Sequence, residues 1–190
     1  MTEPAVRILM ISGSGRDGST NTAVLRTAAE LAPDGVTAEL FTGLLALPLF
    51  NPDDDREDAT PHPAVMAMRA AVAAADALLI STPEYAGALP AALKNMLEWT
   101  IGDAGTYEKP IAWLNAAGPA APRGAADAHA SLHKVLGYAG ADVVADACLR
   151  APVTRDQVGA DGRLTADGPR GTIATAVTRL VSHVRDRTRA

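Results

Sequence analysis

Five short segments of the chain have the hydrophobic pattern of β-strands. The first and third are apolar with little alternation, as expected for parallel strands buried on both faces, and the second alternates between apolar and polar residues. Strand and helix patterns follow one another without any hairpin signal, which favours parallel pairing. The predicted strands cover residues 6–11, 36–41, 77–80, 110–114 and 142–148.

The segments between these strands place apolar residues at helical spacing. Strand and helix therefore alternate along the chain, which predicts an α/β protein with helices on both faces of a five-stranded parallel sheet. We expect one domain over residues 1–190 and a frayed end over 185–190. The predicted helices cover 21–31, 63–75 and 127–137, with a final amphipathic helix through the apolar positions of 173–184.

The segment 13–21, GSGRDGSTN, directly follows the first predicted strand. A glycine and hydroxyl loop before a helix leaves backbone N–H groups free, and an anion bound there gains hydrogen bonds and a favourable dipole. Side chains of this loop can add further donors, and a planar guanidinium suits phosphate. We therefore predict a phosphate-binding loop with Ser14, Arg16, Ser19, Thr20 and Asn21.

Two other interpretations of this loop stay open. Glycine, serine, aspartate and asparagine commonly connect a strand to a helix, and residues 19–21 would then supply an ordinary N-cap without a ligand. The three glycines also fit the dinucleotide fingerprint G-x-G-x-x-G. We regard that fit as accidental, because the polar cluster at 19–21 places the helix start after the last glycine.

A second unusual loop, STPEYAGALP over residues 81–90, follows the third predicted strand. In a doubly wound sheet, ligands bind beyond the carboxyl ends of the strands where the strand order reverses, here between strands one and three. The two loops are therefore expected to face one crevice. Pro83 and Pro90 stiffen the second loop, Gly87 permits close backbone approach and Tyr85 can grip a flat ring. Alternatively, Tyr85 covers the edge of the core and the prolines only shape a turn.

Composition limits the classes of partner. The 17 basic and 22 acidic residues give a net charge of −5, and the scattered basic residues argue against nucleic acid or an anionic membrane as the partner. Cys148 is the single cysteine, which excludes an internal disulfide and suits a reducing cytoplasm. No signal segment or membrane-spanning run is expected.

No metal site is expected either. The acidic run 53–58 lacks the glycine and the final glutamate of a calcium loop, so we interpret it as solvated. His129 and His133 share one helical face without a third ligand, and we interpret them as exposed or interface residues. The apolar segment 44–50 is expected to be satellite core, a cleft cover or a subunit contact.

Taken together, the two loops resemble the NADPH-dependent FMN reductase family, whose members include quinone, azo-dye and chromate reductases. The resemblance extends over almost the whole chain, and residues 47–51 are similar to the family's turn after its second strand. The first family motif, G-S-x-R-x-x-S-x-N, is matched by Gly13, Ser14, Arg16, Ser19 and Asn21. The second, P-E-Y-N-G-S-x-P-x-x-L-K-N, is matched by Pro83, Glu84, Tyr85, Gly87, Pro90, Leu93, Lys94 and Asn95.

The resemblance implies a three-layer flavodoxin-like fold with strand order 2-1-3-4-5. It implies that Ser14, Arg16, Ser19 and Asn21, beside Thr20, hold the phosphate of FMN. It further implies a ring-side wall made of Pro83, Glu84, Tyr85, Ala86, Gly87, Ala117 and Gly118. Two departures stand out, because Ala86 replaces the family's asparagine and Ala88 its serine, so side-chain hydrogen bonds near the ring are expected to be missing. The third loop, 115–124, carries over the family's glycine pattern only at Gly118 and Gly124.

The crevice loops contain no Ser-His-Asp order, paired carboxylates or activated cysteine, so the chemistry is expected to come from a cofactor. The resemblance implies hydride transfer from NADPH or NADH to FMN, and on to a small acceptor: a quinone, azo compound, metal oxyanion or free flavin. Family members are commonly homodimers or homotetramers. Two alternatives stay open, a flavodoxin-type electron carrier and a flavin-free interaction module.

Overall fold

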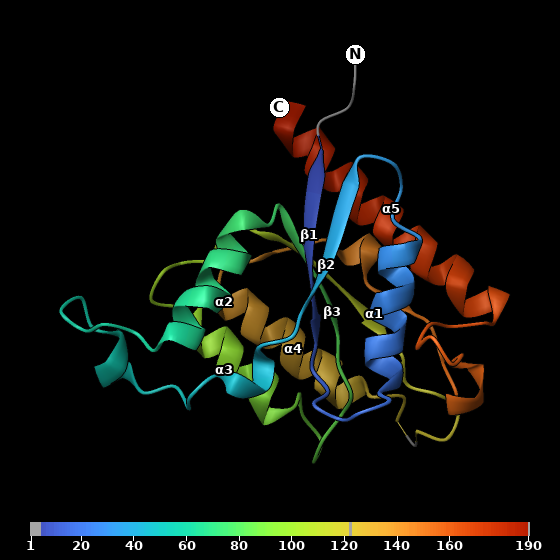
Figure 1. The fold of residues 1–190 in the computed structure, drawn as a ribbon, viewed down its shortest axis with the longest axis horizontal. Coiled ribbons are helices and arrows are strands. Elements are labelled where there is room, and N and C mark those ends of the chain that lie inside the picture. The colour runs from blue at the N-terminus through green and yellow to red at the C-terminus, as the bar shows by residue number, and fades with distance from the viewer. Residues whose placement is uncertain (1–4, 122, 190) are drawn as a thin grey trace.

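The computed structural model describes residues 5–121 and 123–189, and its centre is a parallel β-sheet (Figure 1). The strands run in the order β2-β1-β3-β4-β5, with β6 also paired to β4. This order confirms the expected flavodoxin-like sheet. The strands are β1 (Val6–Ser12), β2 (Val36–Phe41), β3 (Ala77–Ser81), β4 (Pro110–Asn115), β5 (Asp142–Val143) and β6 (Leu149–Arg150).

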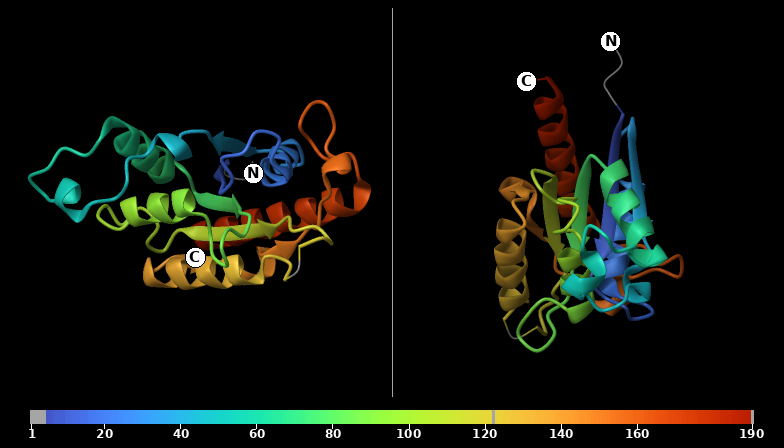
Figure 2. Two further views of the ribbon diagram at one scale, coloured as in Figure 1. Left: turned by 90° about the horizontal axis from the view of Figure 1, so that it is seen from below. Right: turned by 90° about the vertical axis from the view of Figure 1, so that its left-hand side faces the viewer.

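Helices cover both faces of the sheet and complete three layers (Figure 2). One core lies between the sheet and α1 with α5, and a second lies between the sheet and α2, α3 and α4. Along β1, Ile8 and Met10 pack into the first core, whereas Leu9 and Ile11 pack into the second. This two-sided burial explains why β1 shows no polar alternation. The helices are α1 (Thr20–Glu30), α2 (Pro63–Ala74), α3 (Ala91–Trp99), α4 (Ala126–Tyr138) and α5 (Asp167–Arg189).

The fifth predicted strand, 142–148, is wrong as a continuous element. β5 ends at Val143, a 3₁₀ turn follows over Ala145–Ala147, and the chain pairs with β4 again only in β6. Val144 and Ala147 turn inward and are buried in the core beneath α5. Burial of these apolar side chains takes the place of ladder pairing at this edge of the sheet.

The C-terminal end and the acidic run also differ from expectation. α5 remains helical through Arg189, and Arg187 donates to the carboxylate of Asp142 and to the carbonyl of Glu108; Ala190 lies outside the described residues. Within the acidic run, Asp55 is not solvated. Its side chain is 9 % exposed and lies 2.7 Å from the guanidinium of Arg69.

The apolar segment 44–50 is anchored from α3. The side chain of Asn95 donates to the carbonyl of Pro48 at 2.9 Å and accepts from the N–H of Phe50 at 2.7 Å, and Trp99 donates to the same carbonyl. Leu44 is buried, whereas Leu49 is 84 % exposed. The segment is therefore partly satellite core and partly open surface.

The carboxyl ends of β1, β3 and β4 meet at one edge of the sheet, the lower edge in Figure 1. The loop after β1 leads into α1, the loop after β3 into α3, and the loop after β4 into α4. The N–H of Gly13 donates to the carbonyl of Ser81 at 2.9 Å, so the first two loops begin side by side. None of the helices in the described part of the chain is long and apolar enough to cross a membrane.

Candidate functional site

The three loops enclose a hollow of about 280 Å³, here called the β3/β4 hollow because most of its lining follows those two strands. It opens beside the first turn of α1. Half of the twelve residues that the sequence predicts for cofactor binding line it. These are Thr20, Asn21, Pro83, Glu84, Ala117 and Gly118.

A second hollow, of about 260 Å³, lies on the other side of the α1 N-terminus and is here called the β1/β2 hollow. The predicted residues Ser14, Arg16 and Ser19 line it, together with residues at the end of β2. The predicted phosphate loop therefore faces two hollows, and its residues divide between them. Tyr85, Ala86 and Gly87 line neither hollow.

The N-terminus of α1 has open hydrogen-bond donors. Ser19 stands at the N-cap position, yet its side chain makes no capping hydrogen bond and the first turn contains no acidic residue. The first helical bond runs from the N–H of Ala23 to the carbonyl of Ser19 at 3.0 Å. The N–H groups of Thr20, Asn21 and Thr22 precede it, so they are free to bind an anion. An N-cap position without a capping bond favours the anion interpretation over the ordinary N-cap.

Asn21 contributes to this site in a different way from the one its motif implies. Its side chain is buried, and its Oδ1 atom accepts a hydrogen bond from the hydroxyl of Ser81 at 2.9 Å. A Cβ on the neighbouring Gly13 would lie 2.2 Å from the hydroxyl oxygen of Thr82, so only glycine fits there. These contacts hold the first turn of α1 against the end of β3, and they leave both the backbone N–H and the side-chain Nδ2 group of Asn21 as donors.

The loop after β3 ends in a two-residue hairpin turn. Tyr85 and Ala88 exchange two backbone hydrogen bonds of 3.0 and 3.1 Å, and the two central residues, Ala86 and Gly87, have φ angles of 51° and 74°. Positive φ at both positions is the type I′ pattern, for which Asn-Gly is preferred. Alanine in place of the family's asparagine at position 86 therefore destabilises this turn, because alanine adopts a positive φ angle less readily. A Cβ on Gly87 would meet no atom within 4 Å, so its φ angle explains this glycine and close packing does not.

Tyr85 itself is 44 % exposed at the base of this hairpin. A residue that covered the edge of the core would be more buried than this. The exposure of Tyr85 therefore favours the interpretation in which its ring is available to a ligand.

Glu84 has a structural contact that the sequence does not reveal. Its Oε2 atom accepts from the backbone N–H groups of Asp127 and Ala128, at 3.0 and 3.1 Å, in the first turn of α4. The N-cap residue of α4, Ala125, supplies no side-chain bond of its own. A carboxylate from the β3 loop thus caps α4 and fixes the separation of two walls of the β3/β4 hollow.

His129 lies behind this cap and corrects the expectation of an exposed or interface histidine. It is 9 % exposed, and neither ring nitrogen has a hydrogen-bond partner among the described residues. Burial lowers the pKa of His129, and the nearby charge of Glu84 opposes the shift only in part. No three potential ligand side chains gather into a metal site within the described ranges.

Arg123 is a lining residue that sequence reasoning missed. It lies on the rim of the β3/β4 hollow and pairs with Asp127 at 3.1 Å, with its side chain 70 % exposed. Its position in an alanine and proline loop carries no motif, so only the path of that loop brings it to the hollow.

The thiol of Cys148 is not activated. Burial raises the pKa of this thiol to about 11, which leaves it protonated at neutral pH.

Comparison with known proteins assigns this arrangement to a family. The model described as NADPH-dependent FMN reductase matches residues 6–153. The chain belongs to this family. The family's description names FMN, the cofactor that the resemblance of the two loops implies, together with NADPH.

Individual relatives agree with this assignment. A protein named probable NADPH:quinone oxidoreductase 2, from rice, is 41 % identical over 97 residues, which are 50 % of this chain and 47 % of the relative. The chain thus spans about half the length of such curated relatives. A 2-hydroxy-1,4-benzoquinone reductase from a Burkholderia species is 29 % identical over 187 residues, 96 % of this chain and 98 % of the relative.

Among solved structures, the flavoenzyme NAD(P)H:(acceptor) oxidoreductase from Paracoccus denitrificans superposes with a TM-score of 0.73. The alignment covers 94 % of this chain and 99 % of that one, at 23 % identity. At this identity the likeness shows a shared fold.

The left-handed conformation of Ala86 yields a stability prediction. Replacing Ala86 with asparagine is expected to raise the free energy of unfolding by about 0.5–1 kcal/mol, because asparagine tolerates positive φ better than alanine does. Urea denaturation of the wild type and the variant measures this difference. Ala88→Asn, outside the two positive-φ positions, is the matched control, and an equal gain in both variants would contradict the conformational account.

The buried imidazole yields a prediction for pH. Because its folded-state pKa lies below the ordinary value of 6.5, the unfolded chain binds more protons than the folded one just below that pH. The contribution of neutral His129 to the free energy of unfolding is therefore fully present above pH 6.5, and it is lost as the pH falls from 6.5 through the lowered pKa of the folded state. In His129→Leu the free energy of unfolding is expected to depend less steeply on pH, by the equivalent of up to about one proton. Urea denaturation between pH 5 and 7 measures this slope. An unchanged slope would show that another group is responsible, and His133→Leu is the control.

Proposed function

We propose that this chain is an FMN-dependent NAD(P)H oxidoreductase that passes hydride from NAD(P)H, through FMN, to a small acceptor. One observation carries the proposal. The uncapped N-terminus of α1 directs three free N–H groups toward the edge where the three loops meet. Family membership supports the same reading.

The first turn of α1 would hold the FMN phosphate. Thr20 and Asn21 line the β3/β4 hollow, while Ser14, Arg16 and Ser19 line the hollow on the other side of the same turn. A phosphate placed here gains backbone hydrogen bonds, the dipole of α1 and one fixed cation. The residues present fit the group, because the site offers donors and no competing carboxylate in the first turn of the helix.

The flavin ring would lie between the hairpin after β3 and the loop after β4. Pro83 and the backbone of Glu84 form one wall, and Ala117 and Gly118 form the other. Bound FMN supplies the redox chemistry by accepting hydride and passing two electrons on. The protein positions the ring, and the Glu84 cap on α4 keeps the two walls apart by a fixed distance. Exposed Tyr85 and the turn at Ala86 and Gly87 would limit the size of the acceptor.

We further propose a quinone as the acceptor class. Two relatives carry names that state quinone reduction, and one of them aligns with nearly the whole chain. A quinone is flat and apolar, so it suits a solvent-open ring face beside an aromatic side chain. A reducing cytoplasm is the compartment that fits a protein with one buried, protonated thiol.

A homodimer is proposed as the assembly. An apolar groove of about 430 Å³ runs between α3 and α4, with Ile101 and Tyr138 exposed beside it by 55 % and 87 %. The Lys94 and Glu98 side chains pair at 2.6 Å along the groove, and Lys134 lies opposite them. An apolar centre with charges of both signs at its rim suits contact with a second copy.

The function is tested with purified protein titrated with FMN and then supplied with NADPH and 1,4-benzoquinone. We expect bound flavin and NADPH oxidation that requires both FMN and the quinone. Arg16→Ala is expected to weaken FMN binding by about 1.5–3 kcal/mol, the contribution of a charged hydrogen bond.

Arg7→Ala, which replaces an exposed arginine at the start of β1 that lines neither of the two hollows, is the control in the FMN titration. Wild-type protein that binds no FMN would refute the proposal and favour the alternative of a flavin-free interaction module. Protein that binds FMN but oxidises no NADPH would favour the electron carrier. Unchanged FMN affinity in Arg16→Ala alone would remove only the role of this side chain.

The assembly is tested by placing a charge in the groove. Tyr138→Glu is expected to convert a dimer to a monomer in light scattering, because an unpaired carboxylate would be desolvated at the contact. Met66→Glu, at an exposed position on α2 outside this groove, is the control. A wild-type monomer at micromolar concentration would refute the dimer.

A further inference from the structure

The β1/β2 hollow contains a cation that the proposed FMN site does not use. Arg26 lines this hollow together with Arg16, Thr22 and the end of β2, and it belongs to neither loop motif. No ion pair or hydrogen bond engages its guanidinium within the described residues. Asp17 also lines the hollow, so its lining side chains carry one more positive charge than negative.

Arg26 does not belong to the first turn of α1. It lies seven residues after Ser19, which is about 10 Å along the helix axis at 1.5 Å per residue. Its guanidinium lies against the loop before α5, because a Cβ on Gly162 would meet its Nη1 atom at 2.5 Å. Arg26 therefore offers the hollow a cation that is separate from the open N–H groups.

The remaining lining defines what accompanies the anion. Leu40 and Phe41 at the end of β2, with Leu44 and Leu45 beyond it, form the apolar part of the lining, and Thr42 adds a hydroxyl. The hydroxyl of Thr22 pairs with that of Ser12 at 2.8 Å. Leu45 packs directly over the backbone of Gly15, where a Cβ would lie 2.7 Å from its Cδ1 atom. A guanidinium and an aromatic ring in one mostly polar hollow suit a purine that carries a phosphate.

The place of the hollow in the sheet connects it with the redox site. Both hollows open at the carboxyl edge, one beyond β1 and β2 and the other beyond β3 and β4. Neighbouring strands lie about 4.8 Å apart, so the two centres are separated by roughly two strand spacings, about 10 Å. A dinucleotide with its nicotinamide at the flavin can therefore extend its other half over this edge.

We propose that the β1/β2 hollow binds the 2′-phosphorylated adenosine end of NADPH, and that Arg26 is the residue that selects NADPH over NADH. The inference rests on the proposed function for the presence of a nicotinamide nucleotide. It adds the site, the residue and the direction of the preference. NADH lacks the 2′-phosphate and so forgoes the contact with Arg26.

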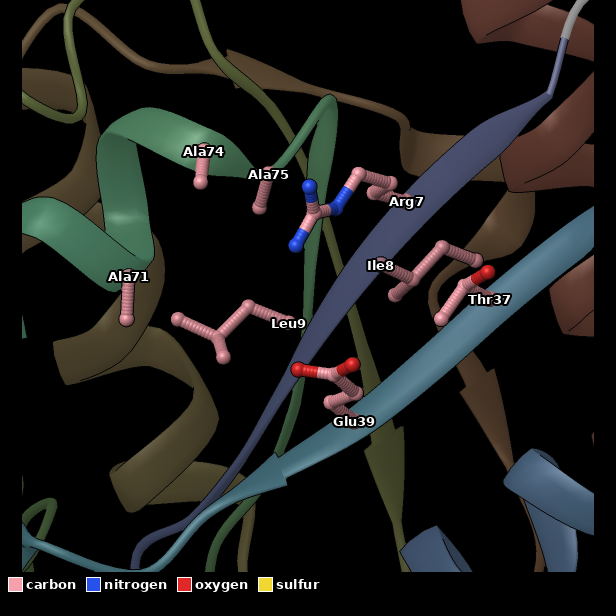
Figure 3. Close-up of a pocket in the computed structure, with 8 residues that line it drawn as sticks. All are labelled: Arg7, Ile8, Leu9, Thr37, Glu39, Ala71, Ala74 and Ala75. Carbon is pink, nitrogen blue, oxygen red and sulfur yellow. The ribbon is translucent and has the colours of Figure 1, made fainter.

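Another arginine provides a matched control. Arg7 extends over a hollow between β1, β2 and the end of α2, beside Glu39 (Figure 3). That hollow measures about 50 Å³, which is too small for a nucleotide phosphate. Arg7 is exposed like Arg26 but lies away from the carboxyl edge of the sheet.

The test is calorimetric titration of the FMN-free full chain with adenosine 2′,5′-bisphosphate and with adenosine 5′-monophosphate. We expect the bisphosphate to bind at least tenfold more tightly. Arg26→Ala is expected to remove this difference, Arg26→Lys to retain part of it, and Arg7→Ala to leave it unchanged. In the FMN-loaded enzyme, Arg26→Ala should raise KM for NADPH at least tenfold, with KM for NADH and the Kd of FMN unchanged.

Equal binding of the two nucleotides by the wild type would overturn the inference, as would equal losses in Arg26→Ala and Arg7→Ala. Matched melting temperatures for Arg26→Lys and the wild type establish that folding is intact. The FMN titration distinguishes failure of the proposed function from failure of this inference. Protein that binds FMN and oxidises NADPH, yet does not prefer the bisphosphate, refutes the role of Arg26 alone.

Discussion

The close approach of the ends of β1 and β3 is the constraint on which the site depends. Gly13 donates to the carbonyl of Ser81, its missing side chain leaves room for Thr82, and Ser81 in turn holds Asn21 in the first turn of α1. Together these contacts bring a helix N-terminus beside the hairpin that follows β3. A side chain at position 13 would force the strand ends apart and separate the anion donors from the wall of the ring site.

The α1 N-terminus then serves two sides of the molecule. Ser14, Arg16 and Ser19 line the β1/β2 hollow, whereas Thr20 and Asn21 line the β3/β4 hollow. One family motif is thus divided between two spaces. This division explains why the motif contains more polar residues than one phosphate requires.

Much of the fold follows from periodicity, since β1 to β4, α1, α2 and α4 lie close to their predicted bounds, whereas α5 extends beyond the predicted 173–184 at both ends. The interrupted fifth strand was not predictable, because the inward turn of Val144 and Ala147 depends on the position of α5. The bond between Glu84 and the first turn of α4 joins residues 43 positions apart, and no local pattern encodes it. The positive φ of Ala86 was not predictable, because the backbone conformation is not visible in a residue name. Asn95, matched to a family motif, holds the carbonyl of Pro48, so a shared motif residue is not always a ligand contact.

The single carboxylate of Glu84 also affects the motions of the site. The loop after β3 is joined to the first turn of α4 by one pair of hydrogen bonds, both accepted by this carboxylate. Neither can move far without exposing those two N–H groups to solvent, so the walls of the hollow must fluctuate as one cooperative unit. Entry of a large planar molecule would then require both walls to open together. The frequency of this opening would be set by the hydrogen bonds of Glu84 to α4, which do not touch the ligand.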